Sequence, residues 1–381
     1  MAAKPGSSRS VEPDTLPSGV SPNRVRRALV RLGALIMFAV VVVTLVPGLG
    51  ELRNRFAHAR PVWIAVGCAL EVLSVLSYVP AFRVVFCTRM TWRTSYKIAV
   101  AEEGAGSLFP VGGAGSLALG VWALRRGGMP AAEIARKTIA FFLLTSLVPV
   151  ATLALLGAGL ATGVLPGHAR VALTVVPAVV SAGAIVATLA LGGLSRRIET
   201  RVRQRTERSR LARLAPALRA TADGVDEAVQ QLRHRHPLLL LGLVGYLAFD
   251  ILALWASFRA VGSEPELTIV WIAYLIGQLG NWLPIPGGIG GVELGLIGML
   301  ILYGLPAVTA TAAVLLYRVI ELWIPAALGI VAFVQLRTLL RREADAIDLC
   351  QPGETIEIIG LGPVIADQGS STSPASRADT P

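Results

Sequence analysis

Long apolar runs recur along the chain, and they limit its possible folds more than any other feature. Examples are "ALIMFAVVVVTLVPGL" near the start and "LLLLGLVGYLAFDILALWASF" in the second half. A run of about 18 or more apolar residues is long enough to cross a bilayer as a helix. Only 15% of the 381 residues are charged, whereas a soluble domain carries about 25%. The sequence therefore predicts an all-α integral membrane protein.

The positions of the basic residues predict its orientation. The net charge of +11 is by itself compatible with a nucleic-acid partner. However, 29 of the 35 Lys and Arg residues fall in segments that a single topology places in the cytoplasm, as the positive-inside rule requires. We therefore expect no nucleic-acid partner, a location in the cytoplasmic (plasma) membrane, and both termini in the cytoplasm.

We expect about seven transmembrane helices plus two re-entrant helical hairpins. Some apolar arms are too short to cross the bilayer separately, and irregular backbone at membrane depth is tolerated only where protein or a wet cavity surrounds it. Such arms are therefore predicted to pair as hairpins, the first entering from the cytoplasm and the second from outside. Six full spans can be located, near 30–49, 61–83, 133–160, 169–193, 237–261 and 307–336, and the hairpins pair 98–109 with 114–124 and 268–283 with 291–303.

Polar segments flank this part of the chain. Residues 1–27 are basic and rich in proline and serine, and 341–381 are polar, so both are predicted to be disordered. The transmembrane domain would occupy 28–340. Its first apolar run lacks a small-x-small cleavage site and is interpreted as an anchor rather than a signal peptide.

The longest polar stretch inside the domain, 195–236, carries eleven arginines and five acids. Its apolar residues have the spacing of one helix face. We expect a basic amphipathic segment in the cytoplasm, which lies on the membrane surface near anionic lipids or packs on a partner; a solvated loop is the alternative. The apolar positions are Leu218, Ala222, Val225, Val229 and Leu232.

The two hairpins resemble each other in sequence. "LFPVGGAGSLALG" (108–120) aligns with "WLPIPGGIGGVELG" (282–295) at the Gly-Gly pairs, and a Gly-x-Pro triplet follows each hairpin. Because the hairpins are predicted to enter from opposite sides, this similarity predicts an inverted repeat. Many transporters have this architecture, with a site near the midplane between the repeats.

Helix breakers mark the tip of the second hairpin. Pro284 and Pro286 should end its descending arm, because proline lacks an N–H and clashes with the preceding turn. The glycines Gly287, Gly288 and Gly290 allow close backbone approach. The helix that follows would begin with free N–H groups able to bind an anion. The alternative is that these glycines only pack helices closely.

Polar residues accompany these breakers. Glu293 would lie in the first turn of the ascending helix, where a carboxylate suits the helix dipole. Gln278 and Asn281 stand just before the break, in reach of a headgroup. The corresponding positions of the first hairpin are Pro110, Gly112, Gly113 and Gly115.

Ionisable residues inside spans are costly and often functional. Arg318 lies about 11 residues into the last span, at roughly 16 Å depth, and Glu321 follows one helical turn later. They could form a structural pair, or the arginine could await a lipid phosphate. Because Glu293 should reach a similar depth, we expect Arg318 and Glu293 to face each other.

Other acids fall within apolar segments. Asp250 and Glu71 lie mid-span, as contacts between helices or as proton sites. Glu102 and Glu103 precede the first break and could face a cytoplasmic vestibule. Cys68, Cys87 and Cys350 form no metal-like cluster, no metal site is expected, and no nucleotide-binding P-loop occurs. We therefore expect no cofactor.

The string "LPIPGGIGGVE" resembles the signature of the lysylphosphatidylglycerol synthase transmembrane region, a flippase-like domain. The resemblance covers about 30–340 and includes "LFPVGGAG" and the Tyr317-Arg318 pair. The first hairpin departs from the commoner form, which is more polar and often carries an acid and an arginine; here Ala118 aligns with Glu293.

The resemblance implies a flippase-like transporter of an anionic or aminoacylated phospholipid or a polyprenyl-linked lipid, with membrane lipids as partners. About 40 polar residues follow the last span, too few for the aminoacyl-transferase domain of bifunctional relatives, so no enzyme activity is expected. Two alternatives remain. One is a secondary carrier of a small solute or ion. The other is a non-transporting scaffold for a membrane or cytoplasmic enzyme that modifies lipids or glycans.

Overall fold

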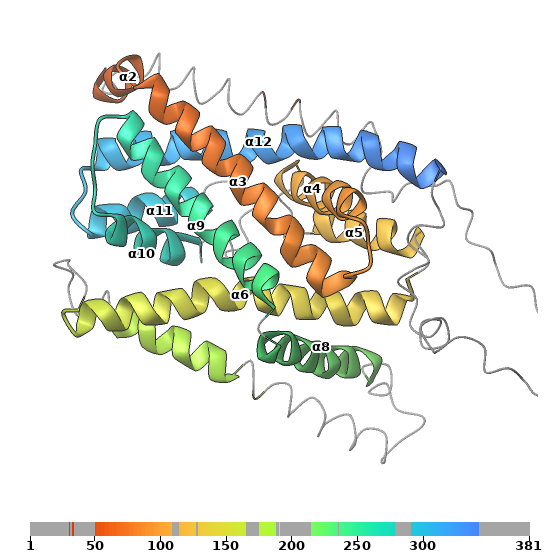
Figure 1. The fold of residues 1–381 in the computed structure, drawn as a ribbon. Helices are drawn as coiled ribbons and strands as arrows, with labels where there is room; N and C mark the ends of the chain where they lie inside the picture. Colours follow the sequence, from red (N-terminus) through yellow and green to blue (C-terminus); the bar gives the residue numbers. More distant parts are fainter. Residues whose placement is uncertain are drawn as a thin grey trace, which may run out of the picture. The chain divides into compact units, whose positions relative to one another are not determined.

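The computed structural model is built from α-helices (Figure 1). It contains no strand within the part of the chain that it describes, and four of its helices are long and apolar enough to cross a membrane. The predicted class, an all-α integral membrane protein, is confirmed. The structure describes residues 50–108, 114–126, 129–164, 175–187, 215–234, 236–278 and 291–342, with the isolated positions 30, 33 and 190.

The four long helices lie where hydropathy places them. They are α3 (Pro61–Phe86), α6 (Ala131–Ala161), α9 (Pro237–Ala260) and α12 (Ala307–Arg342). The predicted span near 169–193 is represented by a shorter apolar helix, Val175–Ala187. The predicted span near 30–49 lies outside the described residues, apart from two isolated positions. A short helix that the sequence did not indicate, α2 (Gly50–Ala57), precedes α3.

Each predicted hairpin is a pair of short helices. The first consists of α4 (Trp92–Leu108) and α5 (Ala114–Arg126), and the second of α10 (Leu267–Gly277) and α11 (Gly291–Leu302). Helix α4 begins six residues earlier than predicted, because the Thr91 side chain accepts a hydrogen bond from the Thr94 backbone N–H at 3.3 Å and caps a polar first turn. The two tips, 109–113 and 279–290, lie outside the described residues.

The helices make contacts in matched pairs. Helices α3 and α9 cross at the centre, α4 packs on α12, and α10 packs on α6 (Figure 1). Within the hairpin units, α5 contacts α6 and α11 contacts α12. If α3, α4, α5 and α6 are matched in order with α9, α10, α11 and α12, the α4–α12 contact corresponds to the α10–α6 contact. The α5–α6 contact then corresponds to the α11–α12 contact. This is the pattern expected of two copies of one structural unit.

The central pair shows how the two units are oriented. Ser74 on α3 donates a hydrogen bond to the Tyr246 carbonyl on α9 at 2.9 Å. Farther along α3, a Cβ on Gly242 of α9 would lie 2.8 Å from the Ser77 carbonyl oxygen. Residue numbers rise on one helix as they fall on the other, so α3 and α9 run antiparallel. Since they are equivalent elements, this supports the predicted inverted repeat.

The amphipathic segment packs on the chain itself. Helix α8 (Ala215–Arg233) contacts α6, and Ala222 and Val225 are buried. A Cβ on Gly224 would lie 2.6 Å from the Ile139 side chain, so the two helices are in close contact. The apolar face of 215–233 therefore packs on α6 of the same chain, which none of the alternatives for 195–236 named, whereas 195–214 lie outside the described residues.

The α4–α12 crossing depends on two glycines. A Cβ on Gly104 would lie 2.5 Å from the Gly329 Cα and 2.6 Å from the Pro325 carbonyl oxygen. Both neighbours are backbone atoms of α12, which cannot move aside as a flexible side chain would. The first hairpin therefore sits against the last span at backbone contact distance.

Gly104→Ala should force α4 and α12 apart and lower the free energy of unfolding by about 1–3 kcal/mol. The matched control is Gly298→Ala on α11, where a Cβ meets nothing within 4 Å and alanine should be neutral or slightly stabilising. Thermal unfolding of the purified protein in detergent measures both. Equal melting temperatures for the two variants would contradict the close crossing.

Candidate functional site

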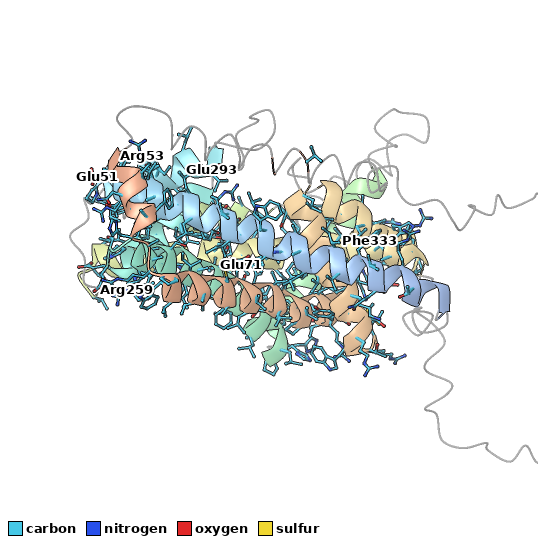
Figure 2. The ribbon with its side chains drawn as sticks, turned by 90° about the horizontal axis from the view of Figure 1, so that it is seen from above. Glu51, Arg53, Glu71, Arg259, Glu293 and Phe333 are labelled. Atoms are coloured by element: carbon cyan, nitrogen blue, oxygen red, sulfur yellow. The ribbon has the colours of Figure 1, made fainter. Side chains whose placement is uncertain are left out.

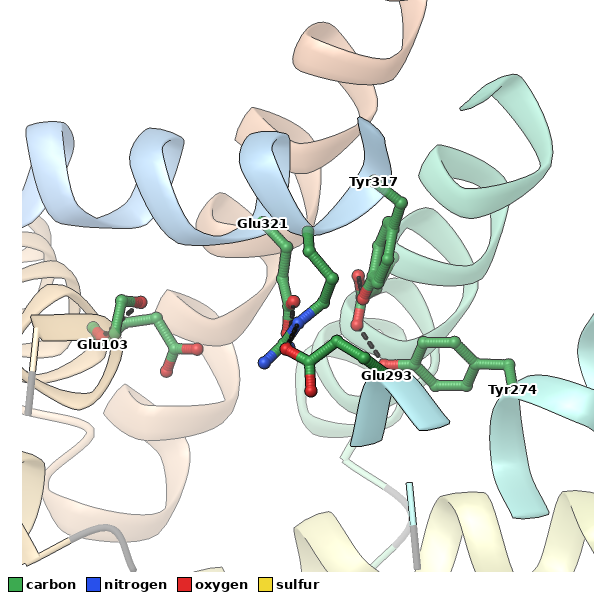
Figure 3. A network of polar contacts seen from close by, with 8 residues as sticks. Glu103, Tyr274, Glu293, Tyr317 and Glu321 are labelled. Carbon is green, nitrogen blue, oxygen red and sulfur yellow. Dashed lines mark hydrogen bonds and ion pairs between the residues drawn. The ribbon is translucent and has the colours of Figure 1, made fainter. Parts of the chain in front are cut away.

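Arg318 connects the second hairpin to the last span. Its Nε donates to Glu293 Oε1 on α11 at 2.7 Å, and its Nη1 donates to Glu321 Oε2 on α12 at 2.5 Å (Figure 3). Only 15% of the Arg318 side chain and 16% of the Glu293 side chain are exposed. The predicted Arg318–Glu293 contact is confirmed, and the Arg318–Glu321 pair coexists with it. One guanidinium therefore holds a carboxylate on each of two helices.

The local packing of the hairpin positions Glu293. It lies in the first turn of α11, where the helix dipole favours a negative charge. Two residues later, a Cβ on Gly295 would lie 2.8 Å from the Gly277 carbonyl oxygen of α10. The arms of the hairpin thus touch through glycines beside the carboxylate. Because of this contact, a movement of α11 would also displace α10.

A second polar group lies beside the first. Asp250 on α9 is buried, and its Oδ1 accepts a hydrogen bond from the Tyr317 hydroxyl at 2.7 Å. Its Oδ2 accepts another from the Tyr274 hydroxyl of α10 (Figure 3). Tyr317 directly precedes Arg318 on α12. The three helices that carry these side chains are therefore tied together next to the ion pair.

Two further acids extend the polar cluster towards the first hairpin. Glu103 on α4 accepts a hydrogen bond from the Tyr246 hydroxyl on α9 at 2.9 Å. Glu71 on α3 is only 3% exposed, and its Oε2 has no hydrogen-bond partner in the described part of the chain. In Figure 2, Glu71 lies between the end of the molecule marked by Glu51 and the region marked by Phe333.

These residues form a single cluster, which we call the carboxylate cluster. Glu71, Glu103, Asp250 and Glu321 interact electrostatically with one another, and Glu321 also pairs with Arg318. Acids therefore outnumber the one arginine among them. Charges inside a membrane are costly unless they are paired, so an arriving cation, proton or phosphate would change the balance of the whole cluster.

The structure brings together only some of the predicted site residues. Glu293, Arg318 and Glu321 meet directly, Gln278 ends α10 at the edge of the hairpin tip, and Gly115 lies near the start of α5. The remaining predicted residues lie outside the described part: Pro110, Gly112, Gly113, Asn281, Pro284, Pro286, Gly287, Gly288 and Gly290. Their substrate-binding role stays a prediction.

The acids of the first hairpin differ from expectation. Glu102 and Glu103 were expected to face a cytoplasmic vestibule, but Glu102 is buried and a Cβ on Gly120 would lie 2.8 Å from its Oε2. Glu103 is half-buried and accepts a hydrogen bond from the Tyr246 hydroxyl. Gly120 on α5 thus makes room for the Glu102 carboxyl group. The sequence pattern of α4 did not indicate that this group would be buried.

Sequence reasoning did not single out Tyr246 and Tyr274, and named Tyr317 only as part of a motif. Each is a phenol inside an apolar run, and tyrosine buried at depth generally needs a hydrogen-bond partner. That signal could have singled out the three tyrosines as hydrogen-bond donors to a buried acid. Within the described residues, no group of three or more His, Cys, Asp or Glu side chains is arranged to hold a metal ion.

Comparison with known proteins identifies the family. The family model of the lysylphosphatidylglycerol synthase TM region matches residues 30–329, and this range includes every helix of both hairpins. The chain belongs to this family. A UPF0104 membrane protein of Methanothermobacter thermautotrophicus is 32% identical over 93 residues, which are 24% of this chain and 28% of that protein. The chain thus matches about a quarter of this relative's length, and no solved structure matches it.

In this member of the lysylphosphatidylglycerol synthase TM family, Tyr317→Phe should remove one hydrogen bond from buried Asp250. The melting temperature should fall, with a loss of about 1–2 kcal/mol in the free energy of unfolding. Tyr96→Phe is the matched control, since the Tyr96 hydroxyl forms no hydrogen bond in the described part of the structure. If the two variants unfold at the same temperature, the Tyr317–Asp250 bond does not stabilise the fold.

Proposed function

We propose that this protein is a flippase-like transporter that moves an anionic or aminoacylated phospholipid or a polyprenyl-linked lipid across the cytoplasmic membrane. The observation that carries the proposal is Arg318, held between Glu293 of the second hairpin and Glu321 of the last span. The proposal assigns no catalysis to the chain and makes membrane lipids its direct partners. A membrane or cytoplasmic enzyme that makes the lipid would be a further partner.

A lipid phosphate would compete for the arginine. Guanidinium binds phosphate through two parallel hydrogen bonds, and Nε and Nη1 of Arg318 are the groups now used by the two carboxylates. Binding of a phosphate would release Glu293, and a headgroup amine or a proton could then neutralise it. Because Glu293 belongs to the hairpin, the exchange would couple lipid entry to movement of α10 and α11.

The surroundings of the ion pair favour a lipid over a small solute. Leu294, next to Glu293, is 69% exposed, and Val319, next to Arg318, is 42% exposed. Both are apolar, so the ion pair borders a surface suited to contact with acyl chains. A lipid could place its headgroup at Arg318 while its chains remain in the bilayer.

We also propose an orientation with both termini in the cytoplasm. Two termini on one side require an even number of crossings, which fits the six span ranges predicted from hydropathy better than about seven. Helix α8 would then face the cytoplasm, and the 262–266 loop would face outside.

Single cysteines test this orientation in a background without the native ones. Gln230→Cys, at an exposed position of α8, should resist an impermeant thiol reagent in intact cells, whereas Glu266→Cys in the outer loop should react. Labelling at position 230 with equal efficiency would overturn the orientation.

Arg318→Gln should reduce lipid translocation by roughly tenfold or more, because it removes a charge-assisted contact to phosphate worth about 1.5–3 kcal/mol. The measurement uses proteoliposomes that contain a headgroup-labelled anionic lipid and an impermeant quencher. The rate at which label becomes accessible reports translocation.

The matched control is Arg337→Gln, an exposed arginine on the same helix, which should keep the wild-type rate. The melting temperature of each variant separates transport from folding. Full transport by a well-folded Arg318→Gln protein would exclude the arginine as the phosphate site. Equal loss of transport and stability would favour a structural ion pair.

A further inference from the structure

We propose that Glu71 and Asp250 form a proton-binding site at the α3–α9 crossing, and that this site takes up a proton when an anionic lipid occupies Arg318. This inference rests on the proposed function and deepens it, since it names the ion that accompanies the lipid. The proton would supply the coupling that a transporter without nucleotide hydrolysis needs.

The two acids hold related positions in the repeat. They lie on α3 and α9, the equivalent helices that cross antiparallel at the centre, and both are buried. The Ser74 hydroxyl bonds to the Tyr246 carbonyl, and a Cβ on Gly67 would lie 3.8 Å from the Ala253 carbonyl oxygen. These two contacts bracket Glu71 and Asp250 on the facing surfaces.

Glu71 provides the observation that points to a ligand. Its side chain is almost fully buried, and Oε2 lacks a hydrogen-bond partner in the described residues. Buried polar atoms are normally satisfied, and an isolated buried carboxylate is strongly disfavoured. A carboxyl group that carries a proton avoids that cost. Asp250 already accepts hydrogen bonds from Tyr274 and Tyr317. Of the two acids, Glu71 is therefore the one with an oxygen that lacks a partner.

Among the residues that the structure describes, no spare cation lies around the pair. Helix α6 also packs on α3 and α9, but its ionisable residues, at positions 133, 136 and 137, all lie in its first two turns. Arg318 is already shared by Glu293 and Glu321. In the described part of the chain, the ionisable groups that interact electrostatically with Glu71 or Asp250 are carboxyl groups, phenols and one thiol, with no base: Cys68, Glu103, Tyr246, Tyr274, Tyr317 and Glu321.

Glu321 links the lipid site to the proton site. It bonds to Arg318 and also lies within electrostatic range of both Glu71 and Asp250. When a phosphate displaces Glu293 from Arg318, Glu321 shares its counterion with the phosphate, and the phosphate adds negative charge nearby. Both changes favour proton binding at Glu71 and Asp250. Linkage is reciprocal, so a bound proton must favour the lipid equally, and the two should travel together.

Infrared titration of the purified wild-type protein in nanodiscs tests the proton site without requiring transport. Raising the pH should remove a band from protonated carboxyl groups, and part of this band should be missing from Glu71→Gln and Asp250→Asn. Glu266→Gln, which removes an exposed acid in the outer loop, should keep the part of the band that Glu71→Gln and Asp250→Asn remove. A wild-type band that neither buried substitution alters would overturn the proton site.

Lipid distribution across proteoliposomes under an imposed pH gradient tests the coupling. One proton per lipid predicts that labelled anionic lipid accumulates in the more alkaline leaflet, by roughly tenfold per pH unit. Glu71→Gln, which mimics a permanently protonated carboxyl group, should remove the response of the lipid distribution to the gradient. The wild-type distribution alone shows whether lipid and proton move together, so the test still holds if the variant misfolds.

The outcomes separate this inference from the proposed function. Translocation by the wild type with a distribution that ignores the gradient would overturn the coupling and leave the lipid transporter intact. Absence of translocation for every anionic lipid tested would overturn the proposed function and the coupling with it.

Discussion

Arg318 lies in the membrane-spanning part of α12, where an unpaired guanidinium would be costly. Its two carboxylate partners come from different elements, Glu293 from a hairpin and Glu321 from its own helix. The requirement for counterions therefore fixes where the second hairpin can dock. The Gly277–Gly295 contact then carries the same constraint to α10. Any ligand that satisfies Arg318 in another way relaxes this arrangement.

The two halves share an architecture but not a chemistry. Both have a long helix, a hairpin and a second long helix, and the equivalent helices α3 and α9 run antiparallel. The second hairpin carries its acid, Glu293, after the helix break, whereas the first carries Glu103 before it. The two halves thus share their helix arrangement but differ in the positions of their acids. As a result, the ion pair centred on Arg318 involves the second hairpin, and the carboxylate cluster extends from it towards the first hairpin.

Hydropathy was sufficient to predict α3, α6, α9 and α12, because spanning a bilayer requires a long apolar run that any reader of the sequence can find. Counting residues from the membrane surface also predicted that Arg318 and Glu293 meet. The hydrogen bonds from Tyr274 and Tyr317 to Asp250 could not be predicted. The two tyrosines lie 24 and 67 positions after Asp250 in the sequence, and no spacing rule relates residues so far apart. Only the packing of three helices brings them together.

The most direct test of the central claim is an experimental structure of the wild-type protein in nanodiscs with its copurified lipid. We expect phosphate density within hydrogen-bond distance of the Arg318 guanidinium, with Glu293 withdrawn from Nε. The acyl chains should lie along the surface that exposes Leu294 and Val319. A lipid-bound structure in which Arg318 keeps both carboxylates while the phosphate lies elsewhere would contradict the account.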